Sequence, residues 1–202
     1  MSDVLEPGLE GPWDFGSFTV TCSRSSRADL VSTLWPVYEE SFGPLRVLAA
    51  ARHVLTQDEF AEELDDPRIW KYIALDREGR PAGLATLADD LSALPWISPE
   101  YYAHKYPEET SRRAAFYNGL TLVRPDMRRY PVFARLVACI GTRVAATRGI
   151  VAFDIGGFND QDRSLAKVTG QLLNKVAEFD VQAVDVQTYY VARAGSRSKE
   201  DS

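Results

Sequence analysis

The sequence predicts a single α/β domain, and three observations support that prediction. The chain has 202 residues, 45% hydrophobic and 26% charged, which suits one sizeable core better than two independent ones. Segments with strand-like alternation are interleaved with segments of helical periodicity. The middle of the chain, from 117 to 155, has the pattern of a strand, a tight turn, a helix and a second strand. The rest of the domain is expected to be organised around this unit.

The N-terminal part is predicted to contain a flexible arm, one strand and a helix. Residues 1–16 are rich in Gly, Pro and acids, which is typical of a loosely held arm. Ser17–Cys22 alternates and is β-prone. Asp29–Phe42 carries apolar residues at helical spacing, and Pro36 inside it predicts a helix that is kinked or in two pieces.

Two further helical segments and a hairpin follow. Pro44–Val54 is an apolar helical stretch, and Thr56–Glu59 is a capping box that begins a helix running to about Leu64. Trp70–Asp76 and Pro81–Leu87 are predicted to pair as a hairpin, because Gly79 between them can take the positive φ of a tight turn.

Residues 89–113 form an aromatic insert between the hairpin and the central unit. Ser98 is expected to cap one short helix there, with Pro99 at its first position. In the central unit we predict a strand over Tyr117–Val123, a helix over Pro131–Thr147 and a strand over Ile150–Ile155.

The end of the chain is predicted to add one helix and one strand. Gln161–Glu178 is amphipathic, and Val181–Ala192 is β-prone. Residues 193–202 are polar and are expected to be a disordered tail.

The turn between the central strand and helix is unusually basic. Between Arg124 and Arg148 the chain has six arginines and one acid, Asp126, although its net charge is −6. The first N–H groups of a helix lack intrahelical partners and face outward with the positive end of the helix dipole. The pattern therefore predicts a site for a small anion, with a solvated helix start as the alternative.

Composition excludes several other classes of protein. An acidic chain without a broad basic stripe argues against a nucleic-acid partner. Cys22 and Cys139 are too few and too far apart for a disulfide framework or a zinc site, so no metal is expected. No apolar run is long enough to span a bilayer. We therefore expect no membrane association and a cytoplasmic location.

The order of these elements, with a phosphate-type turn before the central helix, resembles the GNAT-type acyl-CoA N-acyltransferase superfamily over residues 17–192. The family usually shows Val-x-Pro-x-x-Arg-Gly-x-Gly-x-Gly at that turn. Val123, Pro125 and Arg128 match this pattern. The chain resembles a divergent member, because three of the glycines are replaced, by Arg129, Pro131 and Phe133.

The resemblance implies a GNAT-like fold with a mixed, mostly antiparallel central sheet that splays between the fourth and fifth strands, and with helices on both faces. It implies acetyl-CoA or another acyl-CoA as the co-substrate. The pantetheine arm would pair with the backbone of Leu122 and Val123. Further implied cofactor contacts are Arg128, Arg129, Tyr130, Val132, Phe133, Ala134 and Asn159. Asn159 suits a helix cap equally well, and Ala166 stands where the family has a tyrosine acid.

Several residues are candidates for the acceptor side of such a site. Trp96, Tyr101 and Tyr102 in the insert predict either a substrate lid or a cover for the edge of the core. Glu39 is a candidate contact for a cationic acceptor, or an ordinary exposed acid.

Two residues are candidates for moving a proton. His104 lies in the insert, where an imidazole could take a proton from an acceptor ammonium group. Tyr117 lies near a frequent position for a base on the fourth strand of the family. The alternatives without a catalytic role are that His104 is an ordinary surface residue and that Tyr117 serves packing.

The resemblance implies an N-acyltransferase that moves an acyl group from coenzyme A to an amine by direct attack on the thioester. The acceptor would be a small amine or an amino group of a larger molecule, and a homodimer is compatible with the fold. The alternative is a GNAT-fold module without catalysis that binds a ligand or another protein.

Overall fold

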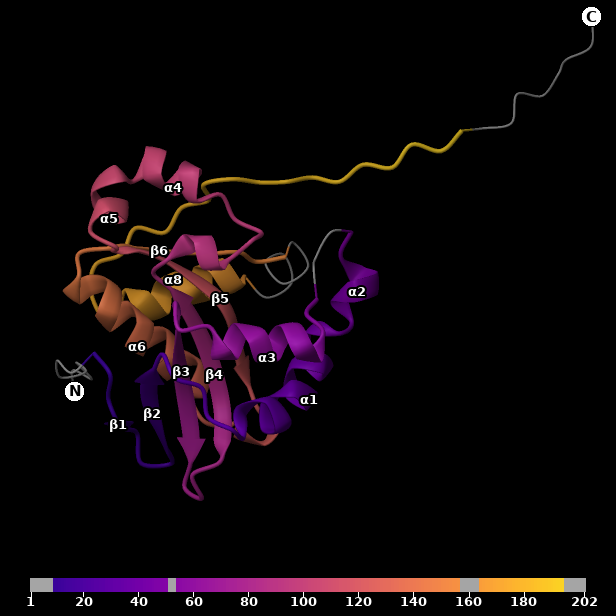
Figure 1. Cartoon of the computed structure of the whole chain (residues 1–202). Coiled ribbons are helices and arrows are strands. Elements are labelled where there is room, and N and C mark those ends of the chain that lie inside the picture. Colours follow the sequence, from indigo (N-terminus) through magenta and orange to yellow (C-terminus); the bar gives the residue numbers. More distant parts are fainter. Residues whose placement is uncertain (1–8, 51–53, 157–163, 195–202) are drawn as a thin grey trace, which may run out of the picture.

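A computed structural model describes residues 9–50, 54–156 and 164–194 of the chain. They form one α/β domain around a six-stranded sheet in the order β1-β2-β3-β4-β5-β6 (Figure 1). Neighbouring strands are antiparallel, except that β5 and β6 are parallel. The predicted mixed, mostly antiparallel sheet is therefore confirmed. The strands are β1 (Trp13–Asp14), β2 (Phe18–Ser23), β3 (Ile69–Asp76), β4 (Pro81–Ala88), β5 (Ala115–Val123) and β6 (Ile150–Phe153).

Helices cover both faces of this sheet, as expected. One core cluster joins α6 to one face through residues such as Val132, Leu136 and Ile140. A second cluster joins α1 and α3 to the other face through Leu34 and Phe60. The helices are α1 (Leu30–Phe42), α2 (Leu45–Leu48), α3 (Gln57–Asp65), α4 (Pro99–Lys105), α5 (Pro107–Ser111), α6 (Val132–Ala146) and α8 (Leu165–Leu173), with 3-10 turns at Leu91–Ala93 and Pro125–Met127.

Local signals explain the best-defined elements. The capping box at α3 is complete: the Glu59 carboxylate accepts from the Thr56 N–H at 2.7 Å, and the Thr56 hydroxyl accepts from the Glu59 N–H at 3.3 Å. Gly79 has φ +75° in the turn between β3 and β4, the conformation that only glycine adopts without strain. The Ser98 side chain caps α4 by accepting from the Tyr101 N–H.

Packing changes several predicted boundaries near the N-terminus. β1 pairs with β2, and Trp13 is buried against Tyr72, so the folded sheet begins before residue 17. Helix α1 is one element with Pro36 inside it. Buried residues on both sides of the proline, Leu30 and Val37, belong to the same core cluster, which favours a continuous helix. Only Leu45–Leu48 is helical within the stretch predicted after it, of which 51–53 lie outside the described residues.

The second half of the chain also differs from the sequence-based expectation. The insert contains two short helices, α4 and α5, where one was expected. Helix α8 ends at Leu173, because the Asn174 side chain accepts from the Phe179 N–H and donates to its carbonyl, closing a turn. The predicted last strand over Val181–Ala192 is wrong: these residues are exposed, extended chain outside the sheet.

None of the helices within the described ranges has both the length and the apolar character that crossing a bilayer requires.

Candidate active site

Strands β5 and β6, the last two in the sheet order, separate partway along β5. They pair only from Ala115 opposite Ile150 to Asn118 opposite Phe153. Beyond that point β5 continues to Val123, still paired with β4. Within the described ranges, residues 119–123 of β5 therefore have no strand on the β6 side. We call the point where the strands separate the fork.

A β-bulge lies at the fork. The pairing of β4 with β5 shifts from Ala85 opposite Thr121 to Leu87 opposite Asn118, so β5 has one extra residue at Gly119–Leu120. The side chain of Thr86 holds this irregular backbone, because its hydroxyl accepts from the Leu120 N–H at 3.1 Å. The Asn118 amide also donates to the Thr86 carbonyl, at 2.7 Å.

Glu63 of α3 reaches the same bulge. Its carboxylate accepts a hydrogen bond of 3.0 Å from the Thr86 hydroxyl. A Cβ atom at Gly119 would lie 3.0 Å from the Thr86 Oγ1 and 3.4 Å from the Glu63 carboxylate, so glycine leaves room for both polar groups against the strand. Within the described parts of the chain, Thr86 is the one residue that hydrogen-bonds to this carboxylate.

Burial raises the pKa of Glu63, against the smaller lowering effects of the Thr86 hydrogen bond and the Lys71 charge. A partly exposed carboxyl group with a raised pKa accepts a proton more readily than an ordinary glutamate does. Sequence analysis missed this residue. One signal was available: Glu63 lies next to Leu64 and three positions after Phe60, both buried, so it belongs near the apolar side of α3.

Lys71 lies opposite Thr86 across the β3–β4 pair and is fully buried. Its ammonium group donates to the carbonyls of Arg24 and Asp66, each at 2.7 Å. Burial lowers the pKa of Lys71, partly offset by nearby acids. These contacts tie the end of β2 to the turn before β3, which gives Lys71 a structural role beside the fork.

Residues 124–130, which we call the arginine turn, follow the end of β5. Arg124 stabilises this turn: its guanidinium contacts Asp76 and Asp126, each at 2.7 Å, and donates to the Pro81 carbonyl at 2.9 Å. The buried side chain of Met127 anchors the same turn from inside. Arg124 is therefore a clamp between the turn and the β3–β4 hairpin.

Arg128 and Arg129 face outward from this turn. Arg128 is exposed and lies 3.9 Å from Glu40 of α1, a loose contact in water. The exposed Arg129 guanidinium stacks over the Tyr130 ring at 4.9 Å. Both cations therefore remain available to an anion at the beginning of α6.

The first turn of α6 offers backbone donors. The helix begins at Val132, and no described side chain caps it. Pro131 precedes it and has no N–H. Val132 is buried, whereas Phe133 and Ala134 are partly exposed. The N-terminus of α6 and the two arginines thus have the make-up of an anion site.

Two of the three remaining arginines of this region pack against aromatic rings, and the third, Arg148, is exposed. Arg143 is buried, donates to the Tyr72 hydroxyl at 2.6 Å and stacks on the Trp70 ring at 4.0 Å. Arg135 lies over the Phe15 ring at 4.8 Å. The basic character that stands out in the sequence is therefore divided between the turn and the core.

The structure brings some of the predicted site residues to the fork. Leu122 and Val123 lie on the free part of β5. Tyr117 is buried one residue before Asn118, and its hydroxyl donates to Asp154, just after β6, at 2.8 Å. Asn159 lies outside the described residues.

Other predicted site residues lie elsewhere. Trp96, Tyr101 and His104 are exposed in the insert, and Tyr102 is buried there in a cluster with Tyr117. This insert covers the Ala88 end of β4, opposite to the arginine turn (Figure 1). Glu39 is partly exposed on α1 and is paired with Arg46 at 3.0 Å.

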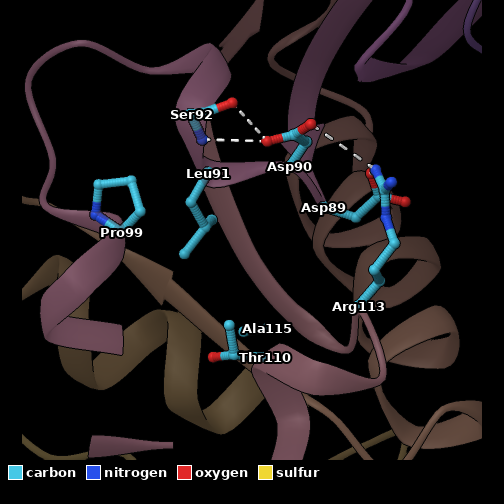
Figure 2. A pocket seen from close by; sticks show the side chains of 8 residues that line it. All are labelled: Asp89, Asp90, Leu91, Ser92, Pro99, Thr110, Arg113 and Ala115. Carbon is cyan, nitrogen blue, oxygen red and sulfur yellow. Dashed lines mark hydrogen bonds and ion pairs between the residues drawn. The ribbon is translucent and has the colours of Figure 1, made fainter. Parts of the chain in front are cut away.

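A hollow of about 240 Å³ lies at the base of the insert. Figure 2 shows Asp90 linked to Ser92 and to Arg113. The neighbouring Asp89 is paired with Arg24 at 2.5 Å and with Arg113 at 3.1 Å. Both acids of the hollow, Asp89 and Asp90, are thus already paired with groups of the same chain. We therefore place the candidate site at the fork. The hollow is lined by Asp89, Asp90, Leu91, Ser92, Pro99, Thr110, Arg113 and Ala115.

Solved structures with the same fold exist, although neither a protein-family model nor a curated protein sequence matches the chain. An aminoglycoside acetyltransferase, meta-AAC0020, from an uncultured soil metagenomic sample, in complex with trehalose, is 13% identical with a TM-score of 0.52 and covers 89% of this chain and 99% of its own. The same enzyme in complex with sisomicin gives 14% identity and a TM-score of 0.50, covering 88% and 97%.

Two further structures agree. Aminoglycoside N-acetyltransferase AAC(6')-Iy in complex with CoA is 12% identical, with a TM-score of 0.50, over 90% of this chain and 100% of that one. An acetyltransferase of the GNAT family from Listeria monocytogenes 4b F2365 is 8% identical, with a TM-score of 0.51, over 78% and 89%. Identities this low establish the fold and leave the activity open. The α/β domain of this chain, a mixed, mostly antiparallel sheet with helices, thus matches the fold of solved GNAT acetyltransferases.

Proposed function

We propose that the protein is an acyl-CoA-dependent N-acyltransferase, with acetyl-CoA or another acyl-CoA as donor and a cationic amine as acceptor. One observation carries this proposal: the free edge of β5 runs between the exposed Arg128 and Arg129 of the arginine turn and the partly buried Glu63 at the fork. Residues 119–123 span roughly 13 Å. A ligand that occupies both ends must be extended, with an anionic end and a distant reactive end, and an acyl-CoA has this form.

The proposed donor contacts follow from this layout. The diphosphate of coenzyme A would meet Arg128, Arg129 and the N–H groups at the beginning of α6. The pantetheine arm would lie along the free edge of β5 at Leu122 and Val123 and add to it as an extended strand does. The thioester would then reach the fork.

The proposed reaction is a direct transfer. Glu63 takes a proton from the acceptor ammonium group, and the free amine attacks the thioester carbonyl. A C–N bond forms and the C–S bond breaks, and the thiolate of coenzyme A leaves. The proton that the attacking nitrogen must still lose passes to this thiolate, directly or through water, so that the products are the neutral amide and free coenzyme A. The free backbone of β5 at the fork supplies dipoles for the developing oxyanion.

The acceptor is proposed to be cationic because the helix that carries Glu63 is strongly acidic. Five of the nine residues of α3 are acids: Asp58, Glu59, Glu62, Glu63 and Asp65. The similar structure solved with sisomicin is an aminoglycoside acetyltransferase, and an amine with several positive charges would suit this surface as well.

Calorimetric titration with acetyl-CoA and longer acyl-CoAs tests the donor half of the proposal. We expect saturable binding, weakened roughly 10-fold or more by Arg128→Ala and by Arg129→Ala, since each removes charge-assisted hydrogen bonds. Arg77→Ala, at an exposed arginine of the β3–β4 turn, is the matched control and should bind normally.

The second candidate function is a GNAT-fold module that binds a ligand without transferring an acyl group. Pro131 and Phe133 favour it, because they place a residue without an N–H and a bulky ring at the start of α6. Absence of acyl-CoA binding at millimolar concentration would contradict the acyltransferase proposal and favour this module. Binding without transfer to any amine of a polyamine and aminoglycoside panel would do the same.

A further inference from the structure

One buried polar side chain of β4 contacts two parts of the fork, the bulge and Glu63. Thr86 is the single residue of Pro81–Ala88 with a polar side chain, and it is buried. Burying a hydroxyl group costs free energy unless new hydrogen bonds replace those to water. The Thr86 hydroxyl therefore needs partners, and it finds both of them at the fork.

The direction of these two hydrogen bonds follows from the chemistry of the groups. The Leu120 N–H can only donate, so the Thr86 oxygen accepts from it, at 3.1 Å. The one proton of the hydroxyl then remains for the Glu63 carboxylate, which accepts it at 3.0 Å. The hydrogen bonds thus run in one direction, from the backbone of the bulge through Thr86 to Glu63.

Hydrogen bonds in this direction favour the ionised form of Glu63. A donor binds a carboxylate more strongly than a neutral carboxyl group, and a hydroxyl that also accepts a hydrogen bond is polarised further. Burial raises the pKa of Glu63, and the hydrogen bond from Thr86 is the largest of the effects that oppose this rise. The Thr86 hydroxyl therefore acts on Glu63 and on the bulge at the same time.

Two charged groups beside these hydrogen bonds also act on Glu63. Lys71 of β3 lies opposite Thr86, and its positive charge lowers the pKa of Glu63, whereas the negative charge of Asp66, just after α3, raises that pKa. Both charges are held in place: Lys71 donates to the Asp66 carbonyl at 2.7 Å, and the Asp66 carboxylate is paired with Arg68. Thr86 is a neutral partner of Glu63, so its hydroxyl can be removed without altering any charge.

We propose that Thr86 is the positioning residue of the fork and that its hydroxyl couples the backbone of the bulge to the protonation of Glu63. While Glu63 is ionised, the polarised hydroxyl holds the Leu120 N–H tightly and the bulge is fixed. When Glu63 takes up a proton, this hold weakens. The fork is thus most rigid when the base is ready to act. That use of the coupling rests on the proposed function, whereas the coupling itself does not.

Nuclear magnetic resonance of the full chain tests the coupling without any substrate. We expect the Leu120 amide resonance to shift with pH at the same midpoint as the Glu63 carboxyl carbon. Glu63→Gln should abolish this inflection, and Glu62→Gln, at an exposed neighbour, should retain it. A Leu120 amide that does not follow the Glu63 carboxyl group in the wild-type chain would overturn the proposal, as would an inflection that persists in Glu63→Gln.

Two substitutions at Thr86 separate its hydroxyl from its shape. Thr86→Val keeps the branched side chain without the hydroxyl, and we expect it to lose the Leu120 inflection and to raise the pKa of Glu63. Its kcat at neutral pH should fall roughly 10-fold or more, because a hydrogen bond to a charged group is lost, and the KM for acyl-CoA should stay the same. Thr86→Ser keeps the hydroxyl and should recover most of these losses. An inflection of full size in Thr86→Val would contradict the coupling.

The two measurements distinguish this inference from the proposed function. If the two resonances titrate together but no amine is acylated, the coupling holds and the acyltransferase proposal fails. If acyl transfer occurs while the Leu120 amide ignores Glu63, the enzyme is shown and the coupling is overturned. Should Thr86→Val fail to fold, the titrations of the wild-type chain and of Glu63→Gln decide the coupling by themselves.

Discussion

At the scale of single residues, Glu63 depends on its surroundings for any chemistry. It is one of several acids in α3, yet it alone meets the Thr86 hydroxyl at the bulge beside Gly119. Burial raises the pKa of Glu63, so the carboxylate holds a proton more readily than an exposed glutamate does. The same residue type on the outer face of α3 would be an ordinary solvated acid.

The substitution Glu63→Gln is predicted to lower kcat roughly 100-fold and leave the affinity for acyl-CoA unchanged, because it removes the base and keeps the shape. In the proposed reaction Glu63 must be deprotonated to act as the base. Activity should therefore rise with pH through the raised pKa of Glu63, and this limb should vanish in the variant. Steady-state kinetics over a pH series measures both effects.

The control for Glu63 is Glu62→Gln, a change at an exposed neighbour on the same helix. It should retain both kcat and the pH profile. Equal losses in the two variants, or an unchanged acidic limb in Glu63→Gln, would assign the effect to the charge of α3 and remove Glu63 from the proposed mechanism.

At the scale of elements, Asp76 joins the β3–β4 hairpin to the arginine turn. Its carboxylate contacts Arg124 at 2.7 Å and accepts from the Arg80 N–H at 2.9 Å. Burial acts to raise the pKa of Asp76, but the hydrogen bonds from Arg124 and Arg80 outweigh it and lower that pKa below its usual range. The hairpin and the turn are thus coupled through one carboxylate.

This coupling predicts a pH-dependent stability. A carboxyl group whose pKa is lowered by folding stabilises the native state above its unfolded pKa, about 4, and loses this contribution as the pH falls further. Asp76→Asn should therefore cost about 1–3 kcal/mol of unfolding free energy at pH 7. The difference between wild type and variant should shrink in acid.

Urea denaturation at a series of pH values from neutral to about 3 measures the difference in unfolding free energy between wild type and Asp76→Asn. Asp126→Asn is a useful comparison, because that carboxylate also contacts Arg124 but is 62% exposed, and exposed pairs contribute little. A constant difference between wild type and Asp76→Asn across the whole pH range would contradict the coupling.

At the scale of the whole molecule, three regions of interest lie one after another along β5. The insert covers its beginning, the fork lies in its middle, and the arginine turn follows its end. Residues 181–192 leave the domain beside α4, on the insert side of the sheet (Figure 1).

The net charge of −6 leads to a prediction at this scale. An acceptor with several positive charges should be attracted to the acidic surface around α3, whereas a singly charged amine should feel less of this field. Raising the ionic strength from about 0.01 to about 0.15 M shortens the Debye length from about 30 to about 8 Å. The KM for a polyamine acceptor should then rise several-fold, and that for a monoamine much less.

Initial rates with the two acceptors at saturating acyl-CoA test this prediction, since the donor should then be bound at both salt concentrations. An identical salt response for the two amines would mean that the acids of α3 do not select the acceptor.

Much of the fold followed from short-range patterns. The capping box at Thr56, the Gly79 turn and the strand-turn-helix unit after Tyr117 each depend on residues within a few positions of one another. The arginine turn was predicted for the same reason. The predicted last strand failed because strand propensity needs a neighbouring strand, and the described part of the chain provides none for Val181–Ala192.

The candidate site needed contacts that no local pattern contains. Thr86 and Glu63 are separated by 23 positions, and Tyr117 and Asp154 by 37. Among the arginines, the structure assigned Arg124 and Arg143 to packing and left Arg128 and Arg129 exposed. Identical side chains thus received different roles through their positions in three dimensions.

The sequence by itself determined the class of the fold, the central strand-turn-helix-strand unit and the basic turn, because periodicity, capping and turn chemistry act along the chain. Only the tertiary structure decided where β5 and β6 separate, which acid meets the bulge, and that residues 181–192 lie outside the sheet. The physical reason is that burial and strand pairing depend on which distant segments meet, and these contacts set the pKa of Glu63 and the open edge of the sheet.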